Sequence, residues 1–444
     1  MKKVITYGTF DLIHYGHIRL LERAKKLGDY LIVGVTSDDF DKARGKINVQ
    51  QSITQRVEAL LATGIPDKNI LEEYEGQKID DIKRYGVDIF TVGSDWKGTF
   101  DYLNEYCEVV YLDRTEGISS SEIRTEKQKV RLGIIGDDFH LIKKYSRECK
   151  YVNGLELAGL CTSRKKLACE RIPDLDFITD DYNELLEKCD AVYIVSHPAE
   201  HYEYIKKALL EKKHVICETP VSLSGKQTSE LFEIAEKNNC VLMEGIKTAY
   251  ALAFERMNLL IKSGVIGDIV SVDATCTSLK APRLYNEDGI LQWGSLASWG
   301  AYAMLPIFDF LGTDIVETKI QTKLLEKDYD LFTKISFVFP HSVASIKVGN
   351  GVKSEGELII SGTKGYIYVP APWWKTDYFE VRYENLQENK RYFYQLEGEG
   401  IRNMLVSFLK TINGDKFTNI SKEFSITVSN IIEQFEEQKD IIIL

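Results

Sequence analysis

Two histidines near the amino terminus have the type and spacing for phosphate chemistry. His14 and His17 stand three residues apart, so in a helix they share one side of the first turn. A short apolar run, Lys3–Tyr7, precedes them, and a helical pattern begins at His17. A helix start presents unpaired N–H groups and partial positive charge, which suit a triphosphate. We therefore expect the two imidazoles to donate hydrogen bonds to an α-phosphate as charge builds on it.

The residues around the histidines strengthen this interpretation. Gly16 leaves the backbone open where a phosphate approaches, and Asp11 would orient the site or help to place Mg²⁺ on the triphosphate. A histidine pair by itself is more often a surface pair or a weak metal site. This pair instead lies in the run Tyr7-Gly8-Thr9-Phe10-Asp11-Leu12-Ile13-His14-Tyr15-Gly16-His17. The setting favours nucleotidyl transfer without a covalent intermediate, and we expect no metal held by the protein itself.

A second segment about 100 residues later has the features of another phosphate-binding helix start. Arg114–Ser121 reads Arg-Thr-Glu-Gly-Ile-Ser-Ser-Ser, in which Gly117 permits a tight turn. Ser119 and Glu122 have the spacing of a capping box, and alone they would predict a plain capped helix. Taken with the first segment, the hydroxyl and N–H groups here would hold the β- and γ-phosphates beside Arg114.

Together the two segments resemble the nucleotidyltransferase superfamily with the HxGH signature. The forms GTFDLIHYGH and RTEGISSS are similar to the glycerol-3-phosphate cytidylyltransferase family, and the resemblance covers residues 1–127. It implies a Rossmann-like domain that forms CDP-glycerol, or a related CDP-polyol, and pyrophosphate from CTP and glycerol 3-phosphate. Glycerol 2-phosphate or a longer polyol phosphate stays open as the acceptor. The product would serve the synthesis of a cell-surface polymer.

The resemblance also implies roles for individual residues. Catalysis falls to His14, His17, Lys46 and Arg114. Nucleotide binding falls to Thr9, Phe10, Asp11, Gly16, Asp95, Thr115, Gly117, Ile118, Ser119, Ser120 and Ser121.

Binding of the polyol phosphate falls to Arg44 and Lys78, and Arg44 stands where the family often has lysine. The run Ala62–Ile65 lacks an arginine that the family often carries, although Arg56 is near in sequence.

The pattern of apolar residues predicts the elements that carry these groups. The expected strands are Lys3–Tyr7, Tyr30–Thr36, Asp88–Val92 and Glu108–Leu112, and the expected helices are His17–Leu27, Gln55–Ala62 and Ile79–Tyr85. This alternation predicts an α/β fold with a parallel sheet. A polar segment, Thr125–Lys129, then interrupts the pattern. We therefore predict domains at 1–127, 129–250 and 251–444.

The remainder resembles the Gfo/Idh/MocA oxidoreductase family over about residues 130–440. Val130–Gly136 reads as a strand that enters a dinucleotide-type turn, and His214–Pro220, which contains Glu218, follows at a Rossmann domain's length. The resemblance implies a second Rossmann domain, followed by a C-terminal α+β domain with a mostly antiparallel open sheet. Its cofactor would be NADP or NAD.

Several signature positions of that family are altered. Asp137, Asp138 and Leu141 follow Gly136 where further glycines are usual, and Asp138 adds bulk and negative charge near a pyrophosphate. Thr219 replaces the catalytic lysine. Ser298 and Tyr302 replace the usual aspartate and histidine.

Other residues favour a retained activity. Ser163 and Arg164 suit the 2′-phosphate of NADP, and Lys247 follows the last parallel strand, where its amine could replace the missing lysine. Lys247 is equally well read as a solvated or ion-paired residue. The candidate reductase site is thus Gly136, Ser163, Arg164, Glu218, Lys247 and Tyr302. Two alternatives stay open: a reductase that makes the polyol phosphate from a keto or aldehyde phosphate, or a silent oligomerisation or regulatory module.

The composition of the 444 residues limits the partners. A net charge of −11 argues against nucleic acid, and the sequence has no apolar segment near 18 residues, so we expect no membrane insertion. The eight cysteines form no CxxC pair, which predicts free thiols in the cytoplasm. The resembled families usually assemble, so a homo-oligomer, a dimer, is expected.

Overall fold

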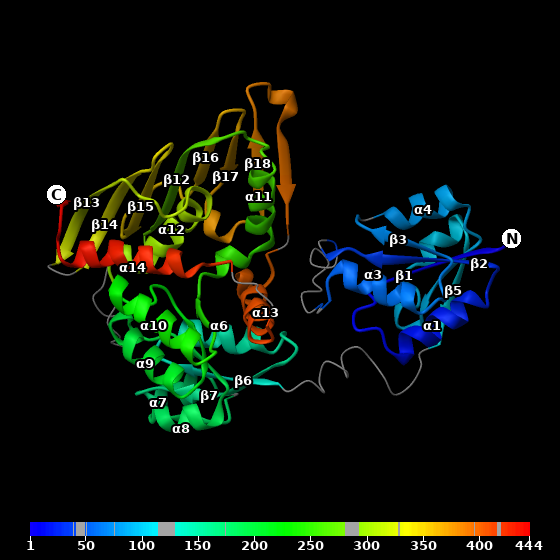
Figure 1. Ribbon diagram of the computed structural model, residues 1–444, viewed down its shortest axis with the longest axis horizontal. Coiled ribbons are helices and arrows are strands. Elements are labelled where there is room, and N and C mark those ends of the chain that lie inside the picture. The colour runs from blue at the N-terminus through cyan, green and yellow to red at the C-terminus, as the bar shows by residue number, and fades with distance from the viewer. Residues whose placement is uncertain are drawn as a thin grey trace. The chain divides into compact units, whose positions relative to one another are not determined.

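The computed structural model describes most of the chain. The described residues are 1–38, 40, 49, 51–74, 76–113, 129–173, 175–279, 293–326, 329–394, 396–414 and 419–444. The chain divides into two compact units, Met1–Lys129 and Val130–Leu444, which are described separately (Figure 1).

The first unit is built on a parallel five-stranded sheet with the order β3-β2-β1-β4-β5. Its strands are β1 (Lys3–Gly8), β2 (Tyr30–Thr36), β3 (Lys68–Glu72), β4 (Ile89–Gly93) and β5 (Glu108–Leu112). Its helices are α1 (Tyr15–Lys25), α3 (Ile53–Ala62) and α4 (Gln77–Tyr85), with 3-10 turns η1 (Ser94–Trp96) and η2 (Asp101–Glu105). The strand order reverses between β1 and β4, so the carboxyl end of β1 lies at the switch point where open α/β sheets bind ligands.

Alternate residues of β1 supply the two apolar layers of this unit. Val4 packs in a cluster with Leu21 of α1 and Leu60 of α3. Ile5 packs on the other face in a cluster with Ile82 of α4. The sheet is therefore covered on both sides, as the predicted α/β class requires.

Capping residues explain where two helices begin. α1 starts at Tyr15, two residues before the expected start, because the His14 side chain accepts a hydrogen bond from the Gly16 N–H. α3 likewise starts at Ile53, because Ser52 and Gln55 form a capping box. The edge strand β3 was not expected from the sequence.

The second unit begins with a parallel six-stranded sheet with the order β11-β10-β9-β6-β7-β8. Its strands are β6 (Val130–Ile135), β7 (Leu155–Cys161), β8 (Ile178–Thr179), β9 (Ala191–Ile194), β10 (His214–Cys217) and β11 (Leu242–Glu244). Its helices are α6 (Phe139–Cys149), α7 (Lys165–Arg171), α8 (Tyr182–Lys188), α9 (Pro198–Leu210) and α10 (Gly225–Lys237). This is the expected second Rossmann-like sheet.

A nine-stranded, mostly antiparallel sheet follows, with the order β19-β18-β17-β16-β12-β15-β14-β13-β20. Its strands are β12 (Ile269–Ser278), β13 (Glu317–Glu326), β14 (Tyr329–Val338), β15 (Val343–Asn350), β16 (Leu358–Gly362), β17 (Tyr366–Val369), β18 (Tyr378–Arg382), β19 (Lys390–Phe393) and β20 (Ile441–Ile443). The pairs β12–β15 and β13–β20 are parallel. The mostly antiparallel sheet was expected.

The described residues of the second unit also form four further helices and four 3-10 turns. The helices are α11 (Leu252–Lys262), α12 (Ser295–Leu311), α13 (Ile401–Ile412) and α14 (Lys422–Glu436), and the turns are η3 (Lys247–Tyr250), η4 (Trp373–Lys375), η5 (Leu386–Glu388) and η6 (Glu397–Gly400). α12 packs against β12, β14 and β15 and against α14 (Figure 1). One apolar cluster contains Ile134 of β6, Val272 of β12 and Met304 of α12. The two sheets of this unit therefore share a core.

Among the helices that the structure describes, none is long and apolar enough to cross a membrane.

Candidate active sites

The first candidate site lies in the turn between β1 and α1. Phe10 and Leu12 have φ values of 52° and 49°, in the left-handed region that side chains rarely adopt. Two contacts with Gln51 hold this turn. The Gln51 N–H donates to Asp11 Oδ1 at 2.9 Å, and Gln51 Oε1 accepts from the Leu12 N–H at 2.7 Å. Asp11 is buried, so its carboxylate orders the turn that leads to the histidines.

The two histidines stack at the start of α1. Their ring centroids lie 4.0 Å apart with 25° between the ring planes, and Phe10 packs edge-on against His17 at 5.5 Å. His14 Nδ1 accepts the Gly16 N–H at 3.0 Å. In a neutral ring this bond places the proton on Nε2, so His14 can donate from that atom. The geometry thus provides a paired imidazole edge at a helix N-terminus.

Arg56, which the sequence indicated only as a nearby cation, contacts the turn that leads to the histidines. The side chain is fully buried on α3. Its Nη1 donates to the carbonyl oxygens of Thr9 at 2.6 Å and Thr36 at 2.9 Å. Its Nε donates to the Gln51 carbonyl at 3.1 Å, and its Nη2 pairs with Asp38 at 2.5 Å. Arg56 therefore joins the ends of β1 and β2 and the chain before α3.

Lys78 lies at the same sheet edge, at the start of α4. It forms an ion pair with the buried Glu72 at the end of β3. Its Nζ lies 4.9 Å from the ring centroid of Tyr7 and 5.5 Å from that of Phe100. The Tyr7 hydroxyl donates to Asp81 at 2.8 Å, and burial raises the pKa of Tyr7 well above its usual range, so this hydroxyl stays protonated. Lys78 is thus held in place by Glu72 and two aromatic rings.

Part of the predicted first site lies outside the described residues. These positions are Arg44, Lys46, Arg114, Thr115, Gly117, Ile118, Ser119, Ser120 and Ser121. Asp95 lies in η1 directly after β4. The structure gathers Thr9, Phe10, Asp11, His14, Gly16 and His17 at the end of β1.

The second candidate site is a pocket of about 960 Å³ in the second unit. Five of the six predicted reductase residues line it, namely Gly136, Ser163, Glu218, Lys247 and Tyr302. Arg164 is not among the lining residues and instead stands at the N-cap of α7.

The turn after β6 has one feature that suits a dinucleotide and one that does not. Gly136 has a φ of 144°, and a Cβ there would lie 2.5 Å from the Val195 carbonyl oxygen, so glycine is required. Asp138, however, caps α6: its Oδ1 accepts the N–H groups of His140 at 3.0 Å and Leu141 at 3.1 Å. Those are the groups that a pyrophosphate would use. The start of α6 therefore does not fit an unaided pyrophosphate.

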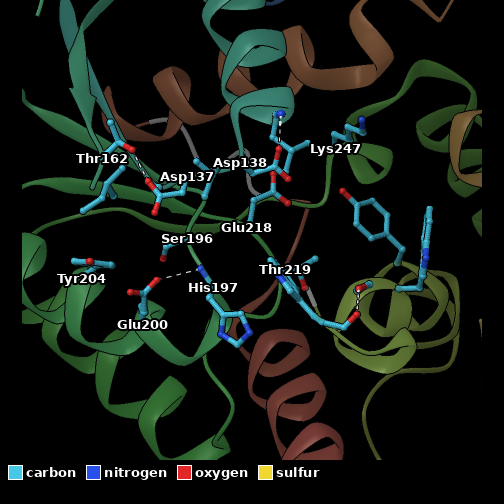
Figure 2. A pocket seen from close by; sticks show the side chains of 18 of the residues that line it. Asp137, Asp138, Thr162, Ser196, His197, Glu200, Tyr204, Glu218, Thr219 and Lys247 are labelled. Atoms are coloured by element: carbon cyan, nitrogen blue, oxygen red, sulfur yellow. Dashed lines mark hydrogen bonds between the residues drawn. The ribbon is translucent and has the colours of Figure 1, made fainter. Parts of the chain in front are cut away.

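Asp137 places a second carboxylate in the same turn. It accepts the hydroxyl groups of Thr162 and Ser163, the latter at 2.9 Å. In Figure 2 the labelled carboxylates of Asp137, Asp138, Glu200 and Glu218 lie around the same open space. The Ser163 hydroxyl is thus held by the protein itself.

Glu218 and Thr219 occupy the centre of the pocket wall. Glu218 accepts hydrogen bonds from the hydroxyls of Tyr145, at 3.0 Å, and Tyr193. Burial raises the pKa of Glu218, although the two tyrosines and the charge of Lys247 oppose this. Thr219, at the position of the family's lysine, donates to Glu244 at 2.6 Å. It contributes no amine to the pocket.

Lys247 and Tyr302, the two proton donors that the sequence indicated, both line the pocket. The Lys247 ammonium pairs with Glu399 at 2.6 Å, which agrees with its ion-paired interpretation. Burial lowers the pKa of Lys247 against the opposing effect of Glu399. Burial and the charge of Glu218 raise the pKa of Tyr302 well above its usual range, so this phenol keeps its proton.

Comparisons with known proteins identify both units. Residues 5–126 match the family model described as cytidylyltransferase-like. Glycerol-3-phosphate cytidylyltransferase from Bacillus spizizenii is 52% identical over 126 residues, which are 28% of this chain and 97% of that protein. The Staphylococcus aureus enzyme of the same name is 49% identical over 126 residues, 28% of this chain and 95% of that protein. The chain belongs to the glycerol-3-phosphate cytidylyltransferase family.

The second unit of the chain matches an oxidoreductase family. Residues 130–246 match the model described as oxidoreductase family, NAD-binding Rossmann fold, which the sequence had indicated as Gfo/Idh/MocA. A 3-ketoreductase from Actinomadura kijaniata, solved with NADP and TDP-benzene, aligns with a TM-score of 0.62 at 19% identity, covering 71% of this chain and 99% of that chain. This likeness shows the fold. The predicted nucleotidyltransferase family and the fused oxidoreductase-like fold are both confirmed.

The sequence did not indicate several other residues that line the pocket of the second unit. Ser196, His197 and Glu200 line the pocket after β9, and the Ser196 hydroxyl is buried with no hydrogen-bond partner among the described residues. The aromatic side chains of Trp293, Trp299 and Trp374 form another part of the wall. The position of Ser196 was the available signal, because it lies two residues after the buried parallel strand β9, where ligand-binding loops begin.

Proposed function

We propose that the first unit transfers CMP from CTP to glycerol 3-phosphate, giving CDP-glycerol and pyrophosphate. The observation that carries this proposal is the stacked pair of His14 and His17 at the start of α1, directly beyond the switch point of the sheet. A phosphate oxygen of the acceptor attacks the α-phosphorus, and the bond to pyrophosphate breaks. Negative charge builds on the α-phosphate during this exchange, and donors placed there stabilise it.

The remaining roles follow from position. His14 donates a hydrogen bond from Nε2 to the α-phosphate, and the N–H groups at the start of α1 add positive potential at the same place. Lys46 and Arg114 would bind the β- and γ-phosphates, with Mg²⁺ entering on CTP. Lys78, held by Glu72 and the rings of Tyr7 and Phe100, would bind the acceptor phosphate together with Arg44.

The test is pyrophosphate release from CTP and Mg²⁺ with glycerol 3-phosphate, compared with glycerol 2-phosphate. We expect His14→Ala and His17→Ala each to lower kcat by about 10²–10³, the cost of removing one transition-state donor. His341→Ala, an exposed histidine in the second unit, is the control. Release that survives both substitutions would exclude the histidine mechanism, and no release with any polyol phosphate would exclude the assignment.

For the second unit we propose a reductase that makes the polyol phosphate from a keto or aldehyde phosphate. The observation in its favour is that Lys247 and Tyr302, both proton donors, line one pocket with Glu218. NADPH or NADH would supply the hydride to the carbonyl carbon. The protein's own part is to deliver a proton to the carbonyl oxygen, from Lys247 or Tyr302. Gly136 fits such a cofactor, whereas the Asp138 cap does not.

The alternative is a silent oligomerisation or regulatory module, which the Asp138 cap favours. Titration of the full chain with NADPH, followed by fluorescence or thermal shift, separates the two alternatives. Asp138→Gly removes the competing carboxylate and is expected to tighten NADPH binding. Asp180→Asn, at another acidic lining residue, is the matched control. If neither the wild type nor the Asp138→Gly variant binds NADPH, the reductase is excluded and the silent module is supported.

We also propose that the protein is a cytoplasmic dimer. Five of its eight cysteines are buried, and all eight are free thiols, a state that a reducing compartment maintains. Light scattering of the purified chain tests the dimer, and a monomeric mass would exclude it.

A further inference from the structure

Three lysines from separate segments meet at one carboxylate in the second unit. Lys247 of η3 lies 2.6 Å from Glu399, Lys375 of η4 lies 3.0 Å from it, and Lys144 of α6 lies 3.2 Å from it. Burial would raise the pKa of Glu399, but the hydrogen bonds and charges of Lys247 and Lys375 lower it to about 2. The carboxylate is therefore ionised at neutral pH. These four side chains alone carry two positive charges in excess, and Glu218, which also lines the pocket, acts on Lys247 as a further carboxyl group.

The excess charge faces the pocket. Lys247 and Lys375 line it, whereas Lys144 and Glu399 do not. Each of the two lining ammonium groups has three N–H donors, and within the described part of the chain Glu399 is the hydrogen-bond partner of both. Donors on both groups thus remain for a ligand in the pocket.

The opposite part of the same pocket is acidic. Asp137, Asp180 and Glu200 line it, and Figure 2 shows Asp137 and Glu200 at a distance from Lys247, whereas Asp138 and Glu218 lie nearer to that lysine. A negatively charged group would be repelled there and attracted to the two lysines. The pocket therefore has a direction, with its anion-binding end at Lys247 and Lys375.

Neighbouring side chains make this end suitable for a small polar molecule. Trp299 and Trp374 pack edge-to-face with centroids 5.0 Å apart, and Trp299 Nε1 donates to Asn350 Oδ1 at 3.0 Å. The Asn350 side chain also hydrogen-bonds the Tyr329 hydroxyl. Trp299, Trp374, Asn350 and Tyr302 all line the pocket. A ligand would thus meet charge, aromatic faces and neutral polar side chains together.

We propose that Lys247 and Lys375 bind the phosphate group of a small polyol or keto phosphate in the second unit. A phosphate monoester near neutral pH carries close to two negative charges, which match the excess of the cluster, and lysine binds phosphate as a point charge. The assignment of this phosphate to a reductase substrate rests on the proposed reductase function. The phosphate-binding site itself does not depend on any catalysis by the second unit.

Protection from acetylation tests the binding site in the full chain. Acetic anhydride labelling, quantified by peptide mass spectrometry, is compared with and without inorganic phosphate, with sodium chloride at equal ionic strength as the reference. Lys206 is a matched control, because it is 34% exposed and paired with Glu230, while Lys375 is 38% exposed and paired with Glu399. We expect phosphate to reduce labelling of Lys375 several-fold and to leave Lys206 unchanged. Glycerol should protect neither.

Two variants distinguish ligand binding from a structural role. Lys375→Gln should abolish protection of Lys247 by phosphate, whereas Lys206→Gln should not. Glu399→Gln removes the competing carboxylate and should lower the phosphate concentration needed for protection at Lys375. If the cluster is purely structural, phosphate should protect Lys375 neither in the wild type nor in the Glu399→Gln variant. Equal labelling of Lys375 with and without phosphate overturns the proposal.

An activity measurement keeps this proposal apart from the reductase. Protection without any substrate-dependent oxidation of NADPH would support the phosphate site and reject the reductase. Oxidation of NADPH with an unphosphorylated ketone and no protection at Lys375 would support the reductase and reject the phosphate site. If both hold, Lys375→Gln should raise KM for the phosphorylated ketone and leave KM for the unphosphorylated one unchanged.

Discussion

At the scale of single residues, Arg56 shows how a buried cation can hold together the segments around a candidate site. It donates to the carbonyl oxygens of Thr9, Thr36 and Gln51, so one side chain fixes three segments. Arg56→Lys keeps the charge but cannot reproduce the fork of donors, and it leaves buried carbonyls without partners.

We expect Arg56→Lys to lower the free energy of unfolding of the first unit by about 1–3 kcal/mol, the cost of leaving buried carbonyl oxygens without a hydrogen bond. Urea denaturation measures this change, and pyrophosphate release should fall in parallel because Thr9 precedes the histidine turn. Arg84→Lys, an exposed arginine of α4, serves as the control. A stable and fully active Arg56→Lys protein would contradict this role.

A second residue, Glu399, gives a pH dependence with a defined sign. Its folded-state pKa of about 2 lies below the ordinary value of 4.5, so its contribution to stability is present above about pH 4.5 and is lost as pH falls towards 2. The difference in unfolding free energy between wild type and Glu399→Gln should therefore shrink as pH falls through this range. Denaturation at several pH values measures it. The same difference at every pH would show that the lysines do not stabilise the ionised form.

At the scale of elements, close packing of β1 on β2 supports the first site. Gly34 of β2 is paired with Tyr7 of β1, and a Cβ at Gly34 would lie 2.2 Å from the Tyr7 ring. Tyr7 in turn lies under Lys78. A displaced ring would therefore disturb both the sheet and the predicted acceptor-phosphate site.

We expect Gly34→Ala to destabilise the first unit by about 1–3 kcal/mol, the usual cost of overpacking, and to raise KM for glycerol 3-phosphate. Gly93 of β4 is the control for stability, because a Cβ there meets nothing within 4 Å and its φ is not positive. Thermal unfolding and initial rates are the measurements. Equal stability of the Gly34→Ala and Gly93→Ala proteins would argue against this packing constraint.

At the scale of the whole molecule, the two compact units predict separable functions. The Bacillus spizizenii glycerol-3-phosphate cytidylyltransferase aligns over 97% of its length with 126 residues of this chain. Residues 1–129 expressed alone should therefore release pyrophosphate with an unchanged kcat/KM for CTP. An inactive but folded fragment would show that the second unit contributes to the first site.

The sequence by itself determined the features that depend on neighbours along the chain. The strand, the turn and His14 and His17 follow from local patterns, and so do the parallel sheets, because β-α alternation leaves few other arrangements. The start of α1 was placed two residues late, because the His14 cap is a side-chain contact and not an apolar pattern.

The tertiary structure decided the contacts between residues that are distant in the chain. Lys247 meets Glu399 across 152 positions, and Asp137 receives the hydroxyl of Thr162 across 25. Neither contact has a periodic signal, because an ion pair or a hydrogen bond depends on where folded segments meet in space. The packing that brings these segments together makes Lys247 ion-paired, one of the two interpretations that the sequence left open, and places it in the pocket wall, while its replacement of the family's lysine stays a prediction.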